Sequence, residues 1–214
     1  MSKLTFLFYL IFLSPNIVTG NSVEIYSLDQ LDDQRGFCID IRGHKSKAEI
    51  NSGLQAHTCY SYQGTIAVDQ GFDPFKLDKG QFRLPAFDVC MEADSNSASA
   101  SLRLSKCQDV GLQKFKWDNN GRIYLTSNMK LCLTVAQGES RKGGGGSPVH
   151  LMRNLSMELC SDTPRAFQMW GTRSEPWPFP LTPPHGKINF MIFIAISYLS
   201  SGPDLRITSG SLCG

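Results

Sequence analysis

The sequence lacks most of the patterns that mark enzymes and metal proteins. It has no Cys-x-x-Cys pair, no Gly-x-Ser-x-Gly motif and no pair of histidines at metal-ligand spacing. The glycines from Gly143 to Gly146 are not followed by Lys-Ser or Lys-Thr, so we interpret them as a flexible insertion rather than a phosphate-binding loop. These absences argue against zinc, serine-hydrolase and nucleotide sites. We therefore expect neither an enzyme nor a bound cofactor or metal.

A strong excess of either charge is also missing. The chain has 21 Lys and Arg against 19 Asp and Glu, which gives a formal net charge of +2. Nucleic-acid grooves and basic membrane faces need concentrated positive charge, and none appears. We expect partners that are neutral or weakly charged, and no nucleic acid.

No apolar run reaches the roughly 20 residues that a membrane helix needs. Residues 1–20 combine Lys3, a short apolar run and a small-residue ending at Gly20, a pattern typical of a secretory signal peptide. We therefore expect a secreted or extracellular chain that starts at Asn21, with a retained anchor as the alternative.

The C-terminal part differs in composition from the rest. Residues 174–187 are rich in proline and predict a stiff linker, and the tail 188–214 contains a short apolar stretch from Ile188 to Leu199. A marginal membrane helix, an additional strand and an altered C-terminus all stay open for that stretch. Attachment to a membrane is therefore undecided.

Internal repeats organise residues 21–173. Three Gln-x-aromatic motifs begin at Gln70, Gln113 and Gln168, and each is preceded by a cysteine. Six of the seven cysteines fall in this region, and Cys213 lies in the tail. In an exported chain such cysteines favour disulfides over metal binding. The chain is thus interpreted as three units, which open at Cys38, Cys90 and Cys132.

Apolar residues flank each opening cysteine with a period of two, as in Phe37, Ile39 and Ile41 around Cys38. A strand with this pattern directs its apolar residues into a core and its cysteine to the opposite face. The second cysteine of each unit follows the same pattern. The pairing this predicts joins the two cysteines of each unit: Cys38 with Cys59, Cys90 with Cys107, and Cys132 with Cys160.

The third unit lacks the last strand that the other two contain after a glycine turn. The segment with Val23, Ile25 and Ser27 precedes the first unit and supplies an alternating strand that could pair with the end of the third. Such closure leaves no open sheet edge.

Together, the Cys-x-Asp opening, the cysteine in mid-unit and the Gln-x-Trp ending resemble the ricin-type β-trefoil lectins over roughly residues 23–173. The stretch 113–135 is also similar to the cysteine-rich domain of mannose-receptor-type proteins. The resemblance implies an all-β fold, a β-trefoil of three repeats with one disulfide per repeat.

The alternation also places polar side chains together in the first unit. Asp40 shares a face with Cys38, and Gln55 and His57 share a face with Cys59. The resemblance to ricin-type lectins implies a galactose site at Asp40, Gln55, His57 and Asp69, in which a carboxylate and amides bind hydroxyls and a flat ring stacks on the sugar. His57 stands where many members have Trp or Tyr, and its imidazole offers a smaller plane for stacking on a sugar.

The other units depart from that pattern. The corresponding residues are Glu92, Arg103, Ser105 and Leu112 in the second unit, and Thr134, Ser156, Glu158 and Phe167 in the third. We therefore expect one working pocket. Asn154 begins an Asn-Leu-Ser sequon on an outward face, and a glycan there is predicted to cover the third pocket.

These observations favour a secreted, non-enzymatic carbohydrate-binding module for galactose-type or N-acetylgalactosamine-type glycans, acting mainly through the first unit. The competing hypotheses are a structural or protein-binding trefoil that has lost sugar recognition, and a binder of sulfated glycans.

Overall fold

The computed structural model describes residues 22–174. The predicted signal peptide and nearly all of the linker and tail therefore lie outside the described residues. In the described range no helix has the length and apolar character that crossing a membrane requires.

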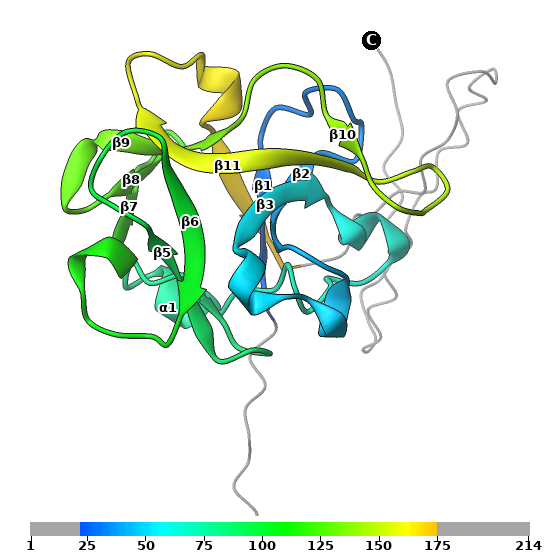
Figure 1. Ribbon diagram of the computed structural model, residues 1–214, viewed down its shortest axis with the longest axis horizontal. Helices are drawn as coiled ribbons and strands as arrows, with labels where there is room; N and C mark the ends of the chain where they lie inside the picture. The colour runs from blue at the N-terminus through cyan, green and yellow to red at the C-terminus, as the bar shows by residue number, and fades with distance from the viewer. Residues whose placement is uncertain (1–21, 175–214) are drawn as a thin grey trace, which may run out of the picture. The chain divides into compact units, whose positions relative to one another are not determined.

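Residues 22–174 form twelve strands connected by turns and loops (Figure 1). The strands are β1 (Glu24–Ser27), β2 (Phe37–Ile41), β3 (Leu54–Thr58), β4 (Arg83–Leu84), β5 (Val89–Ala93), β6 (Ala100–Ser105), β7 (Phe115–Trp117), β8 (Ile123–Leu125), β9 (Asn128–Val135), β10 (Arg141–Lys142), β11 (Leu151–Leu159) and β12 (Trp170–Arg173). The helical turns are η1 (Lys45–Lys47), η2 (Ile50–Ser52), η3 (Tyr60–Gln63), α1 (Pro74–Leu77), η4 (Gly111–Gln113) and η5 (Arg165–Phe167).

The strand pairing repeats three times. The last strand of one unit pairs with the first strand of the next, β4 with β5 and β8 with β9, and β1 pairs with β2 in the same way. The predicted closure is confirmed, because β1 also pairs antiparallel with β12 from Glu24↔Arg173 to Ser27↔Trp170. The fold is an all-β trefoil in which the first and last strands meet.

One long strand, β11, joins the first and third units. It pairs with β3 near its start and with β9 and β6 further along, and it runs across the top of the molecule in Figure 1. This strand brings side chains of the third unit next to those of the first.

The core is formed by the alternating apolar residues of the opening strands. Phe37, Ile39 and Ile41 are fully buried, and their counterparts in β5 and β9 are at most 9% exposed. Trp170 is buried as well, and its indole N–H donates to the Leu133 carbonyl at 3.0 Å. The predicted period of two therefore identified the residues that face the core.

Each unit contains the disulfide that the alternation predicted. The bonds join Cys38 to Cys59, Cys90 to Cys107 and Cys132 to Cys160, with Cα–Cα distances of 4.9, 4.9 and 5.1 Å. The face that carries them is not open to solvent, because the first cysteine of each pair is fully buried.

Candidate functional site

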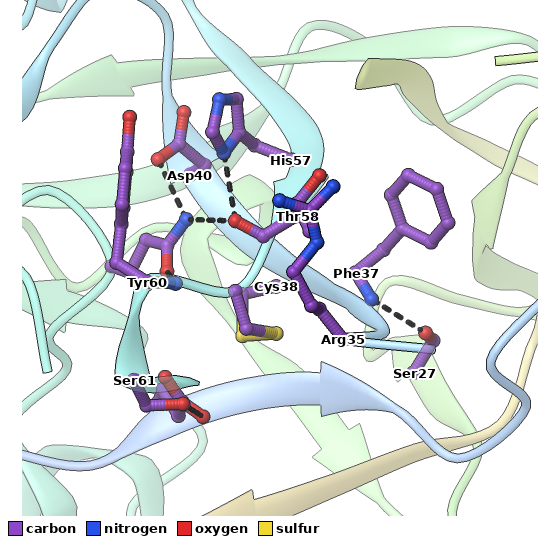
Figure 2. Close-up of a disulfide and its surroundings, with 12 residues drawn as sticks. Ser27, Arg35, Phe37, Cys38, Asp40, His57, Thr58, Tyr60 and Ser61 are labelled. Atoms are coloured by element: carbon purple, nitrogen blue, oxygen red, sulfur yellow. Dashed lines mark hydrogen bonds between the residues drawn. A yellow bond between two sulfur atoms is a disulfide. The ribbon is translucent and has the colours of Figure 1, made fainter. Parts of the chain in front are cut away.

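Two neighbouring strands of the first unit bring together the acid, the amide and the imidazole. In the antiparallel pairing of β2 with β3, Cys38 lies opposite His57 and Asp40 lies opposite Gln55. Paired residues project from the same face of a sheet. Figure 2 shows Asp40 and His57 on the same side of these strands, next to the Cys38 disulfide. The Gln55 Nε2 donates to Asp40 Oδ1 at 3.1 Å.

The fourth predicted residue, Asp69, reaches the group from a loop. Its carbonyl accepts from the Ile41 backbone N–H at 3.1 Å, which fixes the loop against the end of β2. The backbone N–H of Lys45 donates to Asp69 Oδ2. Asp69 Oδ1 is buried and has no hydrogen-bond partner among the described residues.

The neighbouring Gln70 holds Asp40 in place. Its Nε2 donates to Asp40 Oδ2 at 3.0 Å and to the Thr58 carbonyl at 3.4 Å, while its Oε1 accepts from the Tyr60 N–H at 2.9 Å. Gln70 is fully buried and bonds to the backbone at the start of η3. It also fixes the carboxylate, a role that its place beside Asp69 in the sequence did not reveal.

All four predicted residues are more deeply buried than a shallow hollow would allow. Their exposed fractions are 1% for Asp40, 4% for Gln55, 5% for His57 and 0% for Asp69. In the structure the group is covered and not open to solvent. Alternation identifies the face of a strand on which a side chain lies, but it does not reveal which loops cover that face.

Aromatic rings form much of the cover. The His57 ring stacks on Tyr60 at 4.9 Å and on His150 at 5.0 Å between centroids, and Tyr60 lies 5.0 Å from His150. The Lys45 ammonium nitrogen lies 5.1 Å from the centre of the Tyr60 ring. The ring that was predicted to stack on a sugar is thus engaged by two other rings. Tyr60 and His150 belong to the site, although neither was predicted from the sequence.

Burial controls the charges in this group. It raises the pKa of Asp40 well above its ordinary value, and the nearby Asp69 carboxylate adds to the rise, against the lowering by hydrogen bonds from the two glutamines. Burial likewise raises the pKa of Asp69 and lowers that of His57 to about 4. The imidazole is therefore neutral at physiological pH, and the two carboxyl groups oppose each other's ionisation.

In the second unit, the carboxylate is bound by its own neighbours. Glu92 accepts from Gln113 Nε2 at 2.8 Å and from the side chains of Arg103 and Ser105. Burial alone would raise the pKa of Glu92, but these hydrogen bonds lower it to about 2. This carboxylate therefore has less remaining capacity for a ligand.

The third unit has a hydroxyl at the same place. Thr134 Oγ1 accepts from Gln168 Nε2 at 3.1 Å and donates to the Cys132 carbonyl at 2.9 Å. The three repeats thus share one arrangement, in which a buried glutamine bonds to the residue two positions after the opening cysteine. In this arrangement only Asp40 and Glu92 offer a carboxylate.

Asn154 lies on an exposed part of β11, in register with Gln55 of the first unit. Its Oδ1 accepts from Arg42 at 3.4 Å and from Arg141 at 3.2 Å. Its glycosylation, and the covering of the third pocket by a glycan, stay predictions.

Within residues 22–174, one group of three side chains is close enough to hold a metal ion. It consists of Glu24, Cys38 and Cys59, whose ligand atoms lie within 4.8 Å of one another. Both sulfurs form the first disulfide, so neither is available as a thiolate ligand.

A three-repeat β-trefoil with one disulfide per repeat is the architecture of a class of lectin domains. The sequence matches the family model described as ricin-type beta-trefoil lectin domain over residues 27–170. Because this match covers well over half of the chain, the protein belongs to the ricin-type β-trefoil lectin family.

Solved structures show the same fold at low sequence identity. The chain is similar to the agglutinin from Abrus precatorius, with 16% identity, a TM-score of 0.50 and coverage of 77% of this chain and 53% of that one. It thus spans about half the length of that agglutinin chain. Comparison with curated proteins gave no match.

Two shorter trefoils are similar over nearly their whole length. The designed three-fold symmetric protein ThreeFoil has 12% identity, a TM-score of 0.51 and coverage of 72% of this chain and 98% of that one. The C-half of the earthworm R-type lectin, solved in complex with GalNAc, has 14% identity, a TM-score of 0.50 and coverage of 72% and 99%. The similarity to the mannose-receptor-type domain stays an expectation.

Proposed function

We propose that the protein is an exported, non-catalytic carbohydrate-binding module that recognises galactose-type or N-acetylgalactosamine-type sugars through its first repeat. The observation that carries this proposal is the group of Asp40, Gln55 and Asp69, with one buried carboxylate oxygen that has no partner among the described residues. Sugar hydroxyls are donors that such an oxygen can accept. The three disulfides support an oxidising, extracellular location.

The rings of Tyr60 and His150 that pack against His57 form a ring cover over this group, and a sugar can reach the group only if part of this cover moves. His150 follows the glycine-rich segment from Gly143 to Gly146 and lies over His57. Displacing the His150 ring would free one face of the imidazole for stacking. A single site that must first open should bind weakly, with a millimolar constant or about −4 kcal/mol, and useful strength would require several sites.

The decisive experiment is a calorimetric titration of galactose and N-acetylgalactosamine against the wild type and Asp40→Asn. An asparagine can keep its oxygen towards Gln70 and turn its NH2 towards Gln55, whose amide can rotate to accept. The variant should therefore fold while losing the carboxylate. We expect at least a tenfold loss of affinity, because each hydroxyl bond to a carboxylate contributes about 1.5–3 kcal/mol.

The matched control is Glu92→Gln, the same change at the equivalent position of the second repeat. It should leave binding unchanged, since Glu92 is bound by Gln113, Arg103 and Ser105. Circular dichroism of each variant establishes that it is folded. If the wild type bound neither sugar, or if Asp40→Asn bound as well as the wild type, the proposal would fail.

The burial of all four side chains favours a second candidate, a structural or protein-binding trefoil without sugar recognition. In that case the Asp40 group would serve only to hold the loop of Asp69 and Gln70 against β2 and β3. The same titration separates the two functions, because a purely structural group gives no heat with any sugar, even though Asp40→Asn alters stability.

A further inference from the structure

Two positive side chains share one neutral acceptor beside the first-repeat site. Asn154 Oδ1 accepts from an Nη2 of both Arg42 and Arg141, at 3.4 and 3.2 Å. Among the ion pairs of residues 22–174, none involves either arginine. Arg42 is half-buried and Arg141 is exposed. Guanidinium groups bind anions well, because each presents several donors and a full charge.

The electrostatics agree with that geometry. Burial lowers the pKa of Arg42, and the charge of Arg141 lowers it further. Two like charges near each other raise the free energy of the folded protein unless an anion lies between them. The single amide oxygen of Asn154 neutralises neither charge. The pair therefore has unused capacity for a negatively charged group.

The register of the strands places this pair next to the sugar site. Asn154 lies opposite Gln55, which lies opposite Asp40, so these three side chains form one row across β11, β3 and β2. Neighbouring strands are about 4.8 Å apart, so Asn154 and Asp40 are separated by about 10 Å, roughly the span of one or two sugar rings. One glycan could contact both places.

The second arginine belongs to the adjacent row of the same face. Arg141 lies opposite Met152, which lies opposite His57. A hollow of about 650 Å³ is lined in part by Arg42. The polar side chains that line it are those of Arg42, Asn51, Ser52, Asp94, Ser101 and Arg103. Asp94 is bonded to Ser101 and lies 3.5 Å from the Arg103 guanidinium, which reduces its repulsion of an anion.

We propose that Arg42 and Arg141 form an anion subsite that binds the carboxylate or sulfate of an acidic galactose-type glycan whose neutral part lies at Asp40. This subsite deepens the proposed function and rests on it. It narrows the ligand from galactose-type glycans in general to acidic ones, and it assigns the selectivity to two residues outside the Asp40 group.

The test is a titration of four probes, namely galactose, lactose, sulfated galactose and sialyllactose, against the full chain. The wild type should bind at least one acidic probe about tenfold more tightly than its neutral parent, as expected for one or two charge-assisted hydrogen bonds. A gain with the sulfated probe identifies sulfate as the group, and a gain with sialyllactose identifies a carboxylate. The gain should shrink as salt is added.

The variant Arg42→Ala/Arg141→Ala should lose this preference and retain its affinity for neutral sugars. The matched control is Lys106→Ala/Arg165→Ala, which removes two exposed positive charges elsewhere and should keep the preference. All titrations use the Ser156→Ala background, because that change removes the sequon and keeps the Asn154 side chain. A glycan at Asn154 then cannot cover the pair.

The outcomes separate the subsite from the function on which it rests. If neutral sugars bind through Asp40 and acidic sugars bind no better, the subsite is wrong and the proposed function stands. The subsite is also wrong if the preference survives in Arg42→Ala/Arg141→Ala. If no probe of either kind binds, the proposed function fails. The claim that one glycan contacts both Asp40 and the two arginines then fails as well.

Discussion

Replacing Gln70, Gln113 and Gln168 by alanine, one at a time, should destabilise the fold by unequal amounts, with the smallest effect at Gln168. All three side chains are fully buried and occupy equivalent positions in the three repeats. The cavity that alanine leaves is therefore similar in each case. The difference should come from the hydrogen bonds that are lost.

Gln70 has three hydrogen-bond partners. It accepts from Tyr60 N at 2.9 Å and donates to the Asp40 carboxyl at 3.0 Å and to the Thr58 carbonyl at 3.4 Å. A neutral hydrogen bond contributes about 1 kcal/mol and one to a charged group about 1.5–3 kcal/mol, with less for the long contact. The sum is about 3–4 kcal/mol in addition to the cavity. Gln113 should contribute at least as much, since it accepts from the Gln108 N–H at 2.7 Å and donates to the Glu92 carboxylate at 2.8 Å and to the Lys106 carbonyl at 3.0 Å.

Gln168 makes fewer bonds. It donates to Thr134 Oγ1 at 3.1 Å and to the Leu159 carbonyl at 3.4 Å, and its Oε1 has no partner in the described part of the chain. Its hydrogen bonds sum to about 1.5 kcal/mol. Gln168→Ala should therefore be about 2 kcal/mol less destabilising than Gln70→Ala, or about 4–8 °C in Tm for a domain of this size.

Urea denaturation with the disulfides intact measures these differences, with a thermal melt as a second readout. The exposed Gln137 provides the control, and Gln137→Ala should change stability by less than about 0.5 kcal/mol. If Gln168→Ala were as destabilising as Gln70→Ala, the assignment of these energies to hydrogen bonds would be wrong.

Three further predictions follow from burial and backbone geometry. Because the pKa of His57 falls from 6.5 to about 4 in the folded state, its contribution to stability is complete above pH 6.5 and declines by about 3 kcal/mol as pH falls towards 4. Denaturation of wild type and His57→Asn across that range should show a steeper slope in the wild type, since His150, whose pKa is also lowered, keeps part of the slope in the variant. The pKa of Asp40 is raised instead, so the contribution of Asp40 to folding stability is complete below pH 3.8 and declines as pH rises through its folded-state pKa. Asp40→Asn should remove this decline. An unchanged profile of stability against pH would contradict the burial argument. Gly121→Ala should be more destabilising than Gly138→Ala by about 1 kcal/mol or more, although both glycines have φ near +90°. A Cβ at Gly121 would lie 2.9 Å from the Trp170 carbonyl oxygen, whereas a Cβ at Gly138 would meet nothing within 4 Å. Equal melting temperatures of the two variants would refute the close-contact argument.

The trefoil itself could be predicted because its signals are local and occur three times. The alternation around Cys38 determined which residues face the core, and the repeated spacing determined which cysteines pair. The closure of β1 on β12 followed from one missing strand. The pairing of β11 with both β3 and β9 could not be predicted, because the alternation of a strand does not reveal how many other strands it pairs with.

The site was predicted only in part, for a related reason. Asp40, Gln55 and His57 were placed on one face by periodicity, and the structure brings them together with Asp69. Their cover depends on loops from other parts of the chain. His150 is 93 residues from His57 by sequence number, so its position over the imidazole depends on how β11 packs against β3.

The ring cover and the weak binding expected of this site have one physical origin. A sugar that stacks on His57 must displace the His150 ring, and its apparent affinity is reduced by the fraction of molecules in which the site is open. An acidic group bound by Arg42 and Arg141 lies outside the cover, and its binding does not require the rings to move. A ligand that binds first at the arginines would have a high local concentration over the closed pocket. An acidic glycan could therefore compensate for an opening cost that a neutral monosaccharide must overcome alone.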